Sequence, residues 1–285
     1  MPAVSPVGAY ALTRTVVGAA PELRARSLPP MIYSAVGPWE RFPGAAMEIL
    51  PAIDLLRGKC VRLVQGRYDR VIEYERDPVE MADDFRQAGA SWLHVVDLQG
   101  ARSGEIVNLD ALRRIAATGA RVEFGGGVRD EAAIRAALEA GAQRVIIGTR
   151  ALEDWEWFKS AVHQPQFADR LSLGLDARLG KVAIHGWTKD TKQSAIELAE
   201  RVSDWPLATI CYTDIGRDGM LLGPNIEAIR ALSGTSRVPV VAAGGVTDLD
   251  DVRHLAELKL AGIVIGRAFY ENTIDLKQAL DAVGG

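Results

Sequence analysis

The sequence predicts a (β/α)8 barrel, an α/β fold built here from two (βα)4 half-barrel repeats and preceded by an irregular N-terminal extension. Two observations lead to this fold class. Short apolar runs alternate with amphipathic helical segments from Met47 to the end of the chain, and motifs of the first half return in the same order in the second half. Eight strand–helix units in about 240 residues fit a closed barrel. Without the repeat, an open doubly wound sheet would hold such units equally well.

The first 46 residues differ in composition from the rest of the chain. They hold seven of the 13 prolines and four arginines but no lysine, and they keep neither helical nor strand periodicity for long. A disordered extension, or an upstream start chosen in place of Met47, is the simplest interpretation; a targeting peptide is the alternative. We therefore expect the barrel domain to span residues 47–285.

The composition is that of an ordinary globular protein, with 48% hydrophobic and 25% charged residues and a formal net charge of −4. This slightly acidic balance argues against a nucleic-acid-binding face and against a polybasic membrane surface. Cys60 and Cys211 lie far apart and away from any CxxC or histidine spacing, so neither a disulfide nor a zinc site is expected. We expect a cytoplasmic monomer that uses no metal or cofactor and acts on a small molecule.

The expected strands are nearly continuous apolar runs, as in a parallel sheet that is covered on both faces. They span 48–54, 92–97, 121–124, 144–147, 171–176, 209–214, 238–242 and 262–265. The expected helices span 78–88, 108–117, 130–140, 155–163, 191–202, 225–232, 248–258 and 273–282. Asp130 and Asp248 are suitable N-caps for two of them. The connection Leu55–Asp77 is far longer than a usual βα loop, which makes it a candidate lid.

Four pairs of segments carry the internal repeat. The matches are VEFGGGVRD (122–130) with VVAAGGVTD (240–248), RVIIGTRAL (144–152) with GIVIGRAFY (262–270), ILPAIDLLRGKCVRL (49–63) with LSLGLDARLGKVAIH (171–185), and LHVVDLQGA (93–101) with ICYTDIGRD (210–218). They align Asp54 with Asp176 and Asp97 with Asp214. The simplest account is a pair of half-barrels related by a pseudo-twofold axis.

Glycines at the expected strand ends predict two phosphate sites, because the chemistry of such a barrel lies at the C-terminal ends of its strands. Glycine lets backbone approach a ligand, and the start of a helix offers free N–H groups to an anion. One cradle would use Gly126, Gly127, Arg129, Gly148 and Thr149, and the other Gly244, Gly245, Gly266 and Arg267. A lone glycine pair would indicate only a tight turn. Two equivalent pairs, each with a cationic neighbour, favour a long substrate with a phosphate at each end.

Asp54 and Asp176 end the first and fifth strands, which face each other across the mouth of an eight-stranded barrel. Two carboxylates there can divide acid and base roles if their pKa values are pushed apart. A single strand-end Asp is more often a loop anchor, but this pair lies between two expected phosphate cradles, which favours catalysis. Asp97 and Asp214 are left as loop anchors or substrate contacts.

Four further residues have open interpretations. Thr213 ends the sixth strand, and Asp218 follows it in the glycine-rich loop DIGRDGMLLGPN, which could close over the centre of a substrate. Trp187 is either a stacking platform for a heterocycle or a packing residue. His94 lies within an apolar strand, so a core or hydrogen-bonded histidine is expected. No histidines and carboxylates cluster at metal-ligand spacing, so no metal is expected.

Taken together, these motifs resemble one family. The segments that carry the resemblance are PAIDLLRGKCVRLVQG, LHVVDLQGA, FGGGVR, GLDARLGKVAIHGW, YTDIGRDGMLLGPN, AAGGV and IGRAF. They are similar to those of the phosphoribosylformimino-aminoimidazole carboxamide ribotide isomerases of histidine biosynthesis, from Met47 onward. The resemblance implies a half-barrel-repeat barrel that isomerises an aldose to a ketose. The implied reaction is an Amadori rearrangement of the aminoaldose end of a bisphosphorylated nucleotide.

The resemblance also implies roles for individual residues. Asp54 matches the family's general base and Asp176 its general acid, while Thr213 matches a supporting threonine and Asp218 a loop residue near the substrate. The two glycine sets match the phosphate sites. Three departures are visible, Gln99, Glu123 and Met220, where the family usually has Asp, Gln and Thr. They bear on loop details and substrate affinity more than on the type of reaction.

Three alternatives to this function stay open at the level of sequence. The sister barrel, the cyclase subunit of imidazole glycerol phosphate synthase, also has strand-end aspartates and two phosphate sites. A dual-substrate isomerase would serve tryptophan biosynthesis as well. A non-catalytic barrel that binds phosphoribosyl ligands is the alternative from a different class, and the presence of both Asp54 and Asp176 argues against it.

Overall fold

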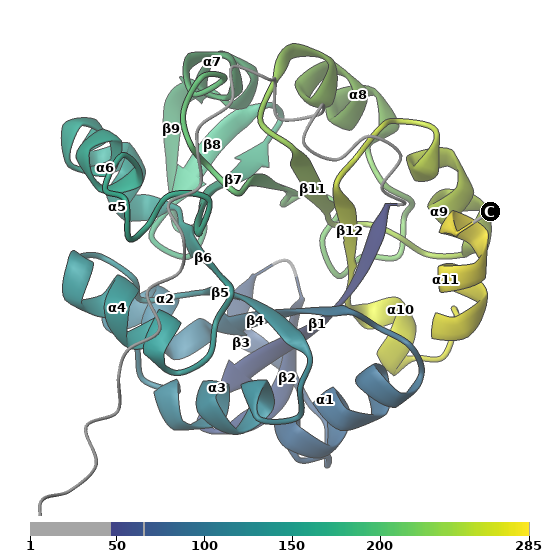
Figure 1. Cartoon of the computed structure of the whole chain (residues 1–285). Coiled ribbons are helices and arrows are strands. Elements are labelled where there is room, and N and C mark those ends of the chain that lie inside the picture. The colour runs from purple at the N-terminus through teal and green to yellow at the C-terminus, as the bar shows by residue number, and fades with distance from the viewer. Residues whose placement is uncertain (1–46, 65, 285) are drawn as a thin grey trace, which may run out of the picture. The chain divides into compact units, whose positions relative to one another are not determined.

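The computed structural model describes residues 47–64 and 66–284, so the expected extension at residues 1–46 lies outside the described residues. Eight parallel strands form a ring in the order β1–β4–β5–β6–β7–β10–β11–β12, and β12 pairs back with β1 (Figure 1). Their bounds are β1 Glu48–Leu56, β4 Trp92–Asp97, β5 Arg121–Gly125, β6 Arg144–Ile147, β7 Leu171–Arg178, β10 Thr209–Asp214, β11 Val240–Ala243 and β12 Gly262–Ile265. The ring closes, which confirms the (β/α)8 barrel and excludes the open sheet.

The helices lie outside the ring of strands in Figure 1. Those at expected places are α1 Pro78–Gln87, α3 Leu109–Ala116, α4 Glu131–Glu139, α6 Trp155–Val162, α7 Ala195–Arg201, α8 Ile226–Thr235, α9 Leu249–Ala256 and α11 Leu276–Val283. The expected caps form, since the side chain of Asp130 accepts from the N–H of Ala133 and that of Asp248 from the N–H of Asp251. Within the described residues, no helix has the length and apolarity to cross a membrane.

Three short helices follow strands directly and have no counterpart in the sequence prediction. They are α2 Leu98–Ser103, α5 Thr149–Glu153 and α10 Arg267–Tyr270. Each is too short for the 3.6-residue period to show in the sequence. Two of them, α5 and α10, occupy equivalent places in the two halves, directly after the expected phosphate-site glycines Gly148 and Gly266.

The long connection after the first strand contains an antiparallel hairpin, β2 Lys59–Val64 and β3 Arg67–Glu73, which continues from β1. The second half repeats this feature after β7, with β8 Lys181–Ile184 and β9 Lys189–Ser194. The helix expected to begin at residue 191 was therefore wrong over its first turn, because α7 begins at Ala195. The segment KDTKQS has no apolar alternation, so its pairing with β8 makes it a strand.

Side chains along the barrel strands alternate between two cores. In β1, Ile49, Ile53 and Leu55 are fully buried in the large hydrophobic cluster shared by strands and helices. Leu50 and Ala52 belong to a second cluster with residues of β4, β11 and β12. This period of two follows from the pleat of the strand. Near the C-terminal ends of the strands, Asp54, Gly125, Gly174 and Thr213 line a pocket.

Candidate active site

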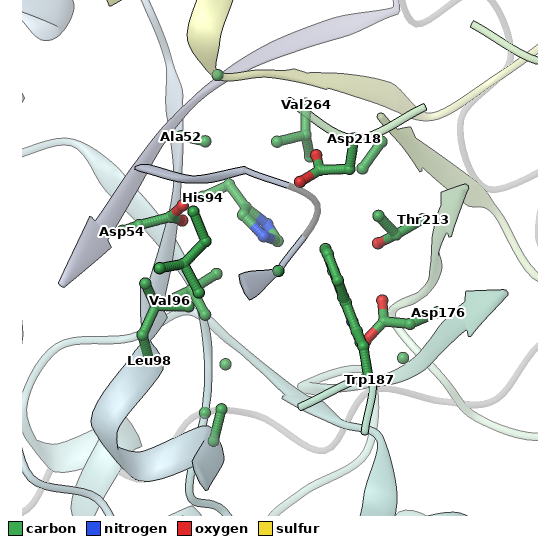
Figure 2. A pocket seen from close by; sticks show the side chains of 18 of the residues that line it. Ala52, Asp54, His94, Val96, Leu98, Asp176, Trp187, Thr213, Asp218 and Val264 are labelled. Atoms are coloured by element: carbon green, nitrogen blue, oxygen red, sulfur yellow. The ribbon is translucent and has the colours of Figure 1, made fainter. Parts of the chain in front are cut away.

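Every residue that the sequence predicts for the site lines a single pocket at the C-terminal ends of the strands. The set brought together is Asp54, Gly126, Gly127, Arg129, Gly148, Thr149, Asp176, Trp187, Thr213, Asp218, Gly244, Gly245, Gly266 and Arg267. Figure 2 shows Asp54 on one side of the pocket and Asp176 with Thr213 on the other. The pocket thus joins residues that lie more than 200 positions apart in the chain.

Asp54 is held by a cation. The Nη1 atom of Arg62, on β2, lies 2.5 Å from its Oδ2 atom, and Arg62 also donates from Nη2 to the carbonyl of Ala52 at 2.6 Å. The hairpin creates this pairing, because β2 folds back antiparallel along β1. Burial lowers the pKa of the Arg62 guanidinium, but the charges of Asp54, Tyr270 and Asp218, together with the hydrogen bond to Asp54, raise that pKa by more than burial lowers it. Asp54 is therefore ion-paired with a buried, fixed positive charge.

Asp176, its counterpart in the second half, has neutral partners. It lies next to Thr213 in the register of β7 and β10, and both Thr213 and Trp187 hydrogen-bond its carboxyl group. Burial raises the pKa of Asp176, and the two hydrogen bonds offset only part of that rise. The two carboxyl groups of the pocket thus differ in environment, one ion-paired and the other buried among neutral donors. That contrast is what separate acid and base roles require.

Asp218 adds a third acid to the pocket. Its carboxyl group comes from the loop after β10 and lines the pocket with Asp54 and Asp176. Burial, together with the negative charge of Asp54, raises the pKa of Asp218 to about 7. A group with this pKa is half protonated near neutral pH.

The glycine pairs have a packing role as well as an exposed backbone. A Cβ atom on Gly126, whose φ is +105°, would lie 2.2 Å from the carbonyl oxygen of Asp97. A Cβ atom on the equivalent Gly244, with a φ of +97°, would lie 2.8 Å from that of Asp214. Close packing of neighbouring βα loops therefore requires glycine at both positions whatever the ligand. The glycine pattern alone is weaker support for phosphate than it seemed from sequence, but both pairs do face the pocket.

The question left open for Asp97 and Asp214 is answered in favour of loop anchors. Asp97 accepts hydrogen bonds from the backbone N–H groups of Gly100, Val107 and Asn108 at 2.7–2.8 Å. Asp214 accepts from the N–H of Gly216 and from the side chain of Asn225. Neither carboxylate lines the pocket. Each one ties the loop after its strand to that strand's end.

Trp187 connects the two hairpin regions above the pocket. It hydrogen-bonds Asp176, and its ring packs so closely on Gly66 that a Cβ atom there would lie 2.2 Å from Cε3. Two residues earlier, His185 donates its backbone N–H to Thr149 Oγ1, and its ring Nε2 atom lies 2.9 Å from Oε1 of Glu153. Trp187 therefore packs on the neighbouring hairpin, as one interpretation expected. It also lines the pocket, and stacking on a heterocycle stays a prediction.

Arg62 and His94 are polar pocket residues that the sequence did not predict for the site. Arg62 stands at an inward position of an apolar hairpin strand, and a charge at such a position is the signal that could have revealed it. His94 was expected to be hydrogen-bonded, and its Nδ1 atom lies 3.0 Å from Glu123 Oε1. It also lines the pocket, which its apolar neighbours in sequence concealed.

One group of side chains among the described residues has the donor types of a metal site. His94, Glu123 and Cys211 are buried, and their donor atoms lie within 4.8 Å of one another. The histidine and the glutamate already bond each other directly. His94 and Glu123 are therefore better described as a hydrogen-bonded pair than as metal ligands. The expected lack of a metal stays a prediction.

Comparison with known proteins identifies the family. The pattern of the family described as histidine biosynthesis protein matches residues 48–275. Relatives named 1-(5-phosphoribosyl)-5-((5-phosphoribosylamino)methylideneamino)imidazole-4-carboxamide isomerase include that of Opitutus terrae, 44% identical over 239 residues that cover 82% of this chain and 98% of the relative. That of Synechococcus sp. strain RCC307 is 47% identical over 84% of this chain and 94% of its own. That of Thermodesulfovibrio yellowstonii is 45% identical, and the match covers 84% of this chain and 98% of the relative. The match confirms what the motifs indicated, and the chain belongs to the histidine biosynthesis protein family.

Proposed function

We propose that this chain is an aldose–ketose isomerase of histidine biosynthesis. It converts 1-(5-phosphoribosyl)-5-((5-phosphoribosylamino)methylideneamino)imidazole-4-carboxamide to the phosphoribulosyl isomer, the reaction type for which its relatives are named. The observation that carries the proposal is the contrast between Asp54 and Asp176, which line one pocket with unlike partners.

The two glycine regions bind the two phosphate groups of the substrate. One lies at Gly126, Gly127, Gly148 and Thr149, where α5 begins, and the other at Gly244, Gly245 and Gly266, where α10 begins. Backbone N–H groups at these places suit phosphate oxygens, and barrels of this class often bind phosphate beside a short extra helix. Arg129 and Arg267 add positive charge at the two ends. A substrate bound in this way spans the pocket, with its reacting sugar between the two acids.

Asp176 is the general acid. Burial favours its protonated form, and it gives its proton to the ring oxygen of the aminosugar as the bond from that oxygen to C1 breaks. The nitrogen lone pair forms the second C–N bond, so the open chain is a protonated imine. Trp187 and Thr213 hold the carboxyl group in place for this transfer.

Asp54 is the general base. It removes the proton from C2, and the electron pair of that C–H bond forms a C1=C2 double bond while the imine nitrogen becomes neutral. The resulting enolamine has its hydroxyl on C2. Movement of the hydroxyl proton to C1 gives the ketone. Proton exchange with water then removes the proton from Asp54 and restores the one on Asp176, so the overall reaction consumes no other reactant. Arg62, whose Nη1 atom lies 2.5 Å from Oδ2 of Asp54, holds that carboxyl group in place for the proton removal. Each proton transfer contributes about 10²–10⁴-fold to the rate.

The acid, the base and both phosphate regions that the mechanism uses line one pocket of this chain, and we propose that a single copy carries out the reaction with these groups. The test is a turnover assay of the purified full chain with the aminoaldose bisphosphate, in the presence of a chelator, with ketose formation followed over time. Turnover supports the isomerase. Conversion of the ketose product in the presence of ammonia would indicate the cyclase instead, and substrate binding without turnover would indicate a non-catalytic binder.

A further inference from the structure

A polar cluster lies inside the barrel, beneath the pocket. Glu123, on β5, is fully buried, and its Oε1 atom lies 3.0 Å from Nδ1 of His94 on the neighbouring β4. Its other oxygen, Oε2, faces Thr209 Oγ1 at 3.4 Å and Arg144 Nη1 at 3.9 Å. Thr209 is bonded in turn to Ser172, with 2.7 Å between the two hydroxyl oxygens. Both oxygens of the carboxylate therefore have partners within the barrel.

The contact between Glu123 and His94 determines which ring nitrogen carries a hydrogen. A carboxylate oxygen can only accept, so with Glu123 ionised the contact is donated by an N–H on Nδ1 of His94. A neutral imidazole with its hydrogen on Nδ1 has a free lone pair on Nε2. A second partner commonly sets the tautomer and the ring orientation of a functional histidine in this way.

The other edge of the His94 ring is available to a ligand. The imidazole lines the pocket, and Figure 2 shows it pointing into the space shared with Asp54, Asp176 and Asp218. The structure gives Nε2 no hydrogen-bond partner among the described residues, while Nδ1 is engaged with Glu123. A buried ring with one bonded nitrogen and one nitrogen toward the pocket is built to meet a polar group there.

We propose that Glu123 is a positioning residue of this enzyme, which acts through His94. By accepting the hydrogen of Nδ1 it fixes the ring and leaves Nε2 as an acceptor for a hydroxyl group of the sugar, close to the reacting carbons. The proposal rests on the proposed function, because it assumes that the reacting sugar lies between Asp54 and Asp176. In this role Glu123 needs an acceptor oxygen at the position of Oε1. Its charge and its size are not what matters.

Two substitutions separate the acceptor from the carboxylate charge. Glu123→Gln keeps an acceptor oxygen for Nδ1 and is expected to keep kcat within about threefold of the unmodified enzyme. Glu123→Met keeps the length of the side chain but has no such acceptor. It is expected to lower kcat by about 10- to 100-fold with little change in KM, since the phosphate contacts that dominate binding are untouched. Equal kcat in the two variants, whether high or low, would overturn the proposal.

Nitrogen-15 NMR of His94 reads the tautomer directly and needs no substrate. The unmodified protein and Glu123→Gln are expected to show a protonated Nδ1 and an unprotonated Nε2, whereas Glu123→Met is expected to lose that pattern. A hydrogen on Nε2 alone in the unmodified protein would overturn the proposal even if the Met variant failed to fold. If the tautomer is as expected but the unmodified enzyme does not isomerise the substrate, the proposed function fails. That outcome is distinct from a failure of the positioning role, which the tautomer itself would reveal.

Two further variants test whether Glu123 acts through His94. In an His94→Asn background, Glu123→Met is expected to cause no additional loss of kcat, because the residue it acts through is gone. Additive losses would contradict the positioning role. The matched control is Thr209→Val, which removes a different hydrogen bond to the same carboxylate. It is expected to lower the melting temperature while kcat stays within about twofold; an equal loss of kcat there would show a purely structural role for the cluster.

Discussion

The two halves of the barrel share a backbone and differ at the positions around their catalytic carboxyl groups. In the first half, Asp54 faces Arg62 across the hairpin and Val96 on the neighbouring strand. The repeat places Ile184 and Thr213 at the corresponding positions beside Asp176. The position of the cation Arg62 is thus taken by the apolar Ile184, and the position of the apolar Val96 is taken by the hydroxyl-bearing Thr213. The same scaffold gives a carboxylate on one side and an acid of raised pKa on the other.

The features that do not differ serve the scaffold. The loop anchors Asp97 and Asp214 each bond a following Asn, Asn108 in the first half and Asn225 in the second. Gly148 and Gly266 have nearly the same backbone angles, with φ of −103° and −106°. The comparison teaches that loop geometry is common to both halves, while a few side chains assign the chemistry. Exchanging those side chains between the halves is the direct way to test it.

The largest effect is expected from removal of either carboxylate. Asp54→Asn and Asp176→Asn are each expected to lower kcat by about 10³-fold or more, because each deletes one proton-transfer group. Neither side chain belongs to the hydrophobic core, so circular dichroism is expected to stay normal in both variants. The melting temperature is expected to stay close to normal in Asp176→Asn and to fall in Asp54→Asn, because that change leaves the buried Arg62 without its ion pair. Asp69→Asn, which changes an exposed carboxylate on β3, is the matched control and is expected to be fully active. A near-normal kcat in either catalytic variant would refute its assignment.

The next largest effect is expected when the first half receives the residue of the second. Arg62→Ile copies Ile184 and leaves Asp54 without its cation. We expect kcat/KM to fall by about 100-fold and stability to fall by about 1–3 kcal/mol, since a largely buried carboxylate loses its partner. Steady-state kinetics and urea unfolding measure the two effects. Arg67→Ile, on the exposed strand of the same hairpin, is expected to cost less than about 1 kcal/mol and no activity; matching losses would mean that Arg62 only holds the hairpin.

A smaller effect is expected from Thr213→Val, which copies Val96 into the second half. The hydrogen bond from Thr213 favours the charged form of Asp176, so its loss raises the pKa of Asp176 further. The acid must be protonated to act, and the high-pH limb of the kcat profile should therefore move to higher pH, with kcat about 3- to 10-fold lower. Val96→Thr, the reciprocal change, is expected to leave that limb in place. A shift toward lower pH in Thr213→Val would contradict the assignment of Asp176 as the acid.

The smallest effect concerns Asp218, which the repeat aligns with Ala101. Burial and the charge of Asp54 raise the pKa of Asp218 in the folded protein to about 7, well above the ordinary value of an aspartate. Its contribution to stability is thus fully present below about pH 4 and is lost as the pH rises through about 7. Asp218→Asn removes this dependence and is expected to be more stable than the unmodified protein at pH 8, by about 1–2 kcal/mol. Urea unfolding at pH 5 and pH 8 measures it; equal differences at both pH values would show that Asp218 does not titrate in this range.

Much of the fold follows from sequence because its signals are local. The strands β4, β6, β10 and β12 have the predicted bounds, since short apolar runs between capped helices leave few other choices. The hairpins were missed because their strands depend on pairing with each other. The polar strand β9 has no pattern that distinguishes it from a loop or the start of a helix.

The site was predictable where the repeat marked it. The repeat aligns three pairs of acidic residues, Asp54 with Asp176, Asp97 with Asp214 and Asp130 with Asp248, and so reduced the 37 acidic residues to a few candidates. Arg62 and Ile184 occupy equivalent positions but are unlike, so a search for similarity between the halves passes over them. Glu123 and His94 meet only because β4 and β5 are neighbours in the ring, 29 residues apart in the chain. What the repeat hides is the difference between the halves, and the difference determines the chemistry.

The pairing of β1 with β12 has a consequence for how the chain must be made. These strands belong to the two extremes of the barrel sequence, and they meet as Glu48 with Gly262 and Pro51 with Ile265. On the ribosome, β1 and β11 each present an unpaired, apolar edge until β12 has emerged. The last strand to be synthesised therefore removes both edges at once. A chain that stops before Gly262 would keep them open, and we expect such a product to aggregate or be degraded rather than to persist as an incomplete barrel.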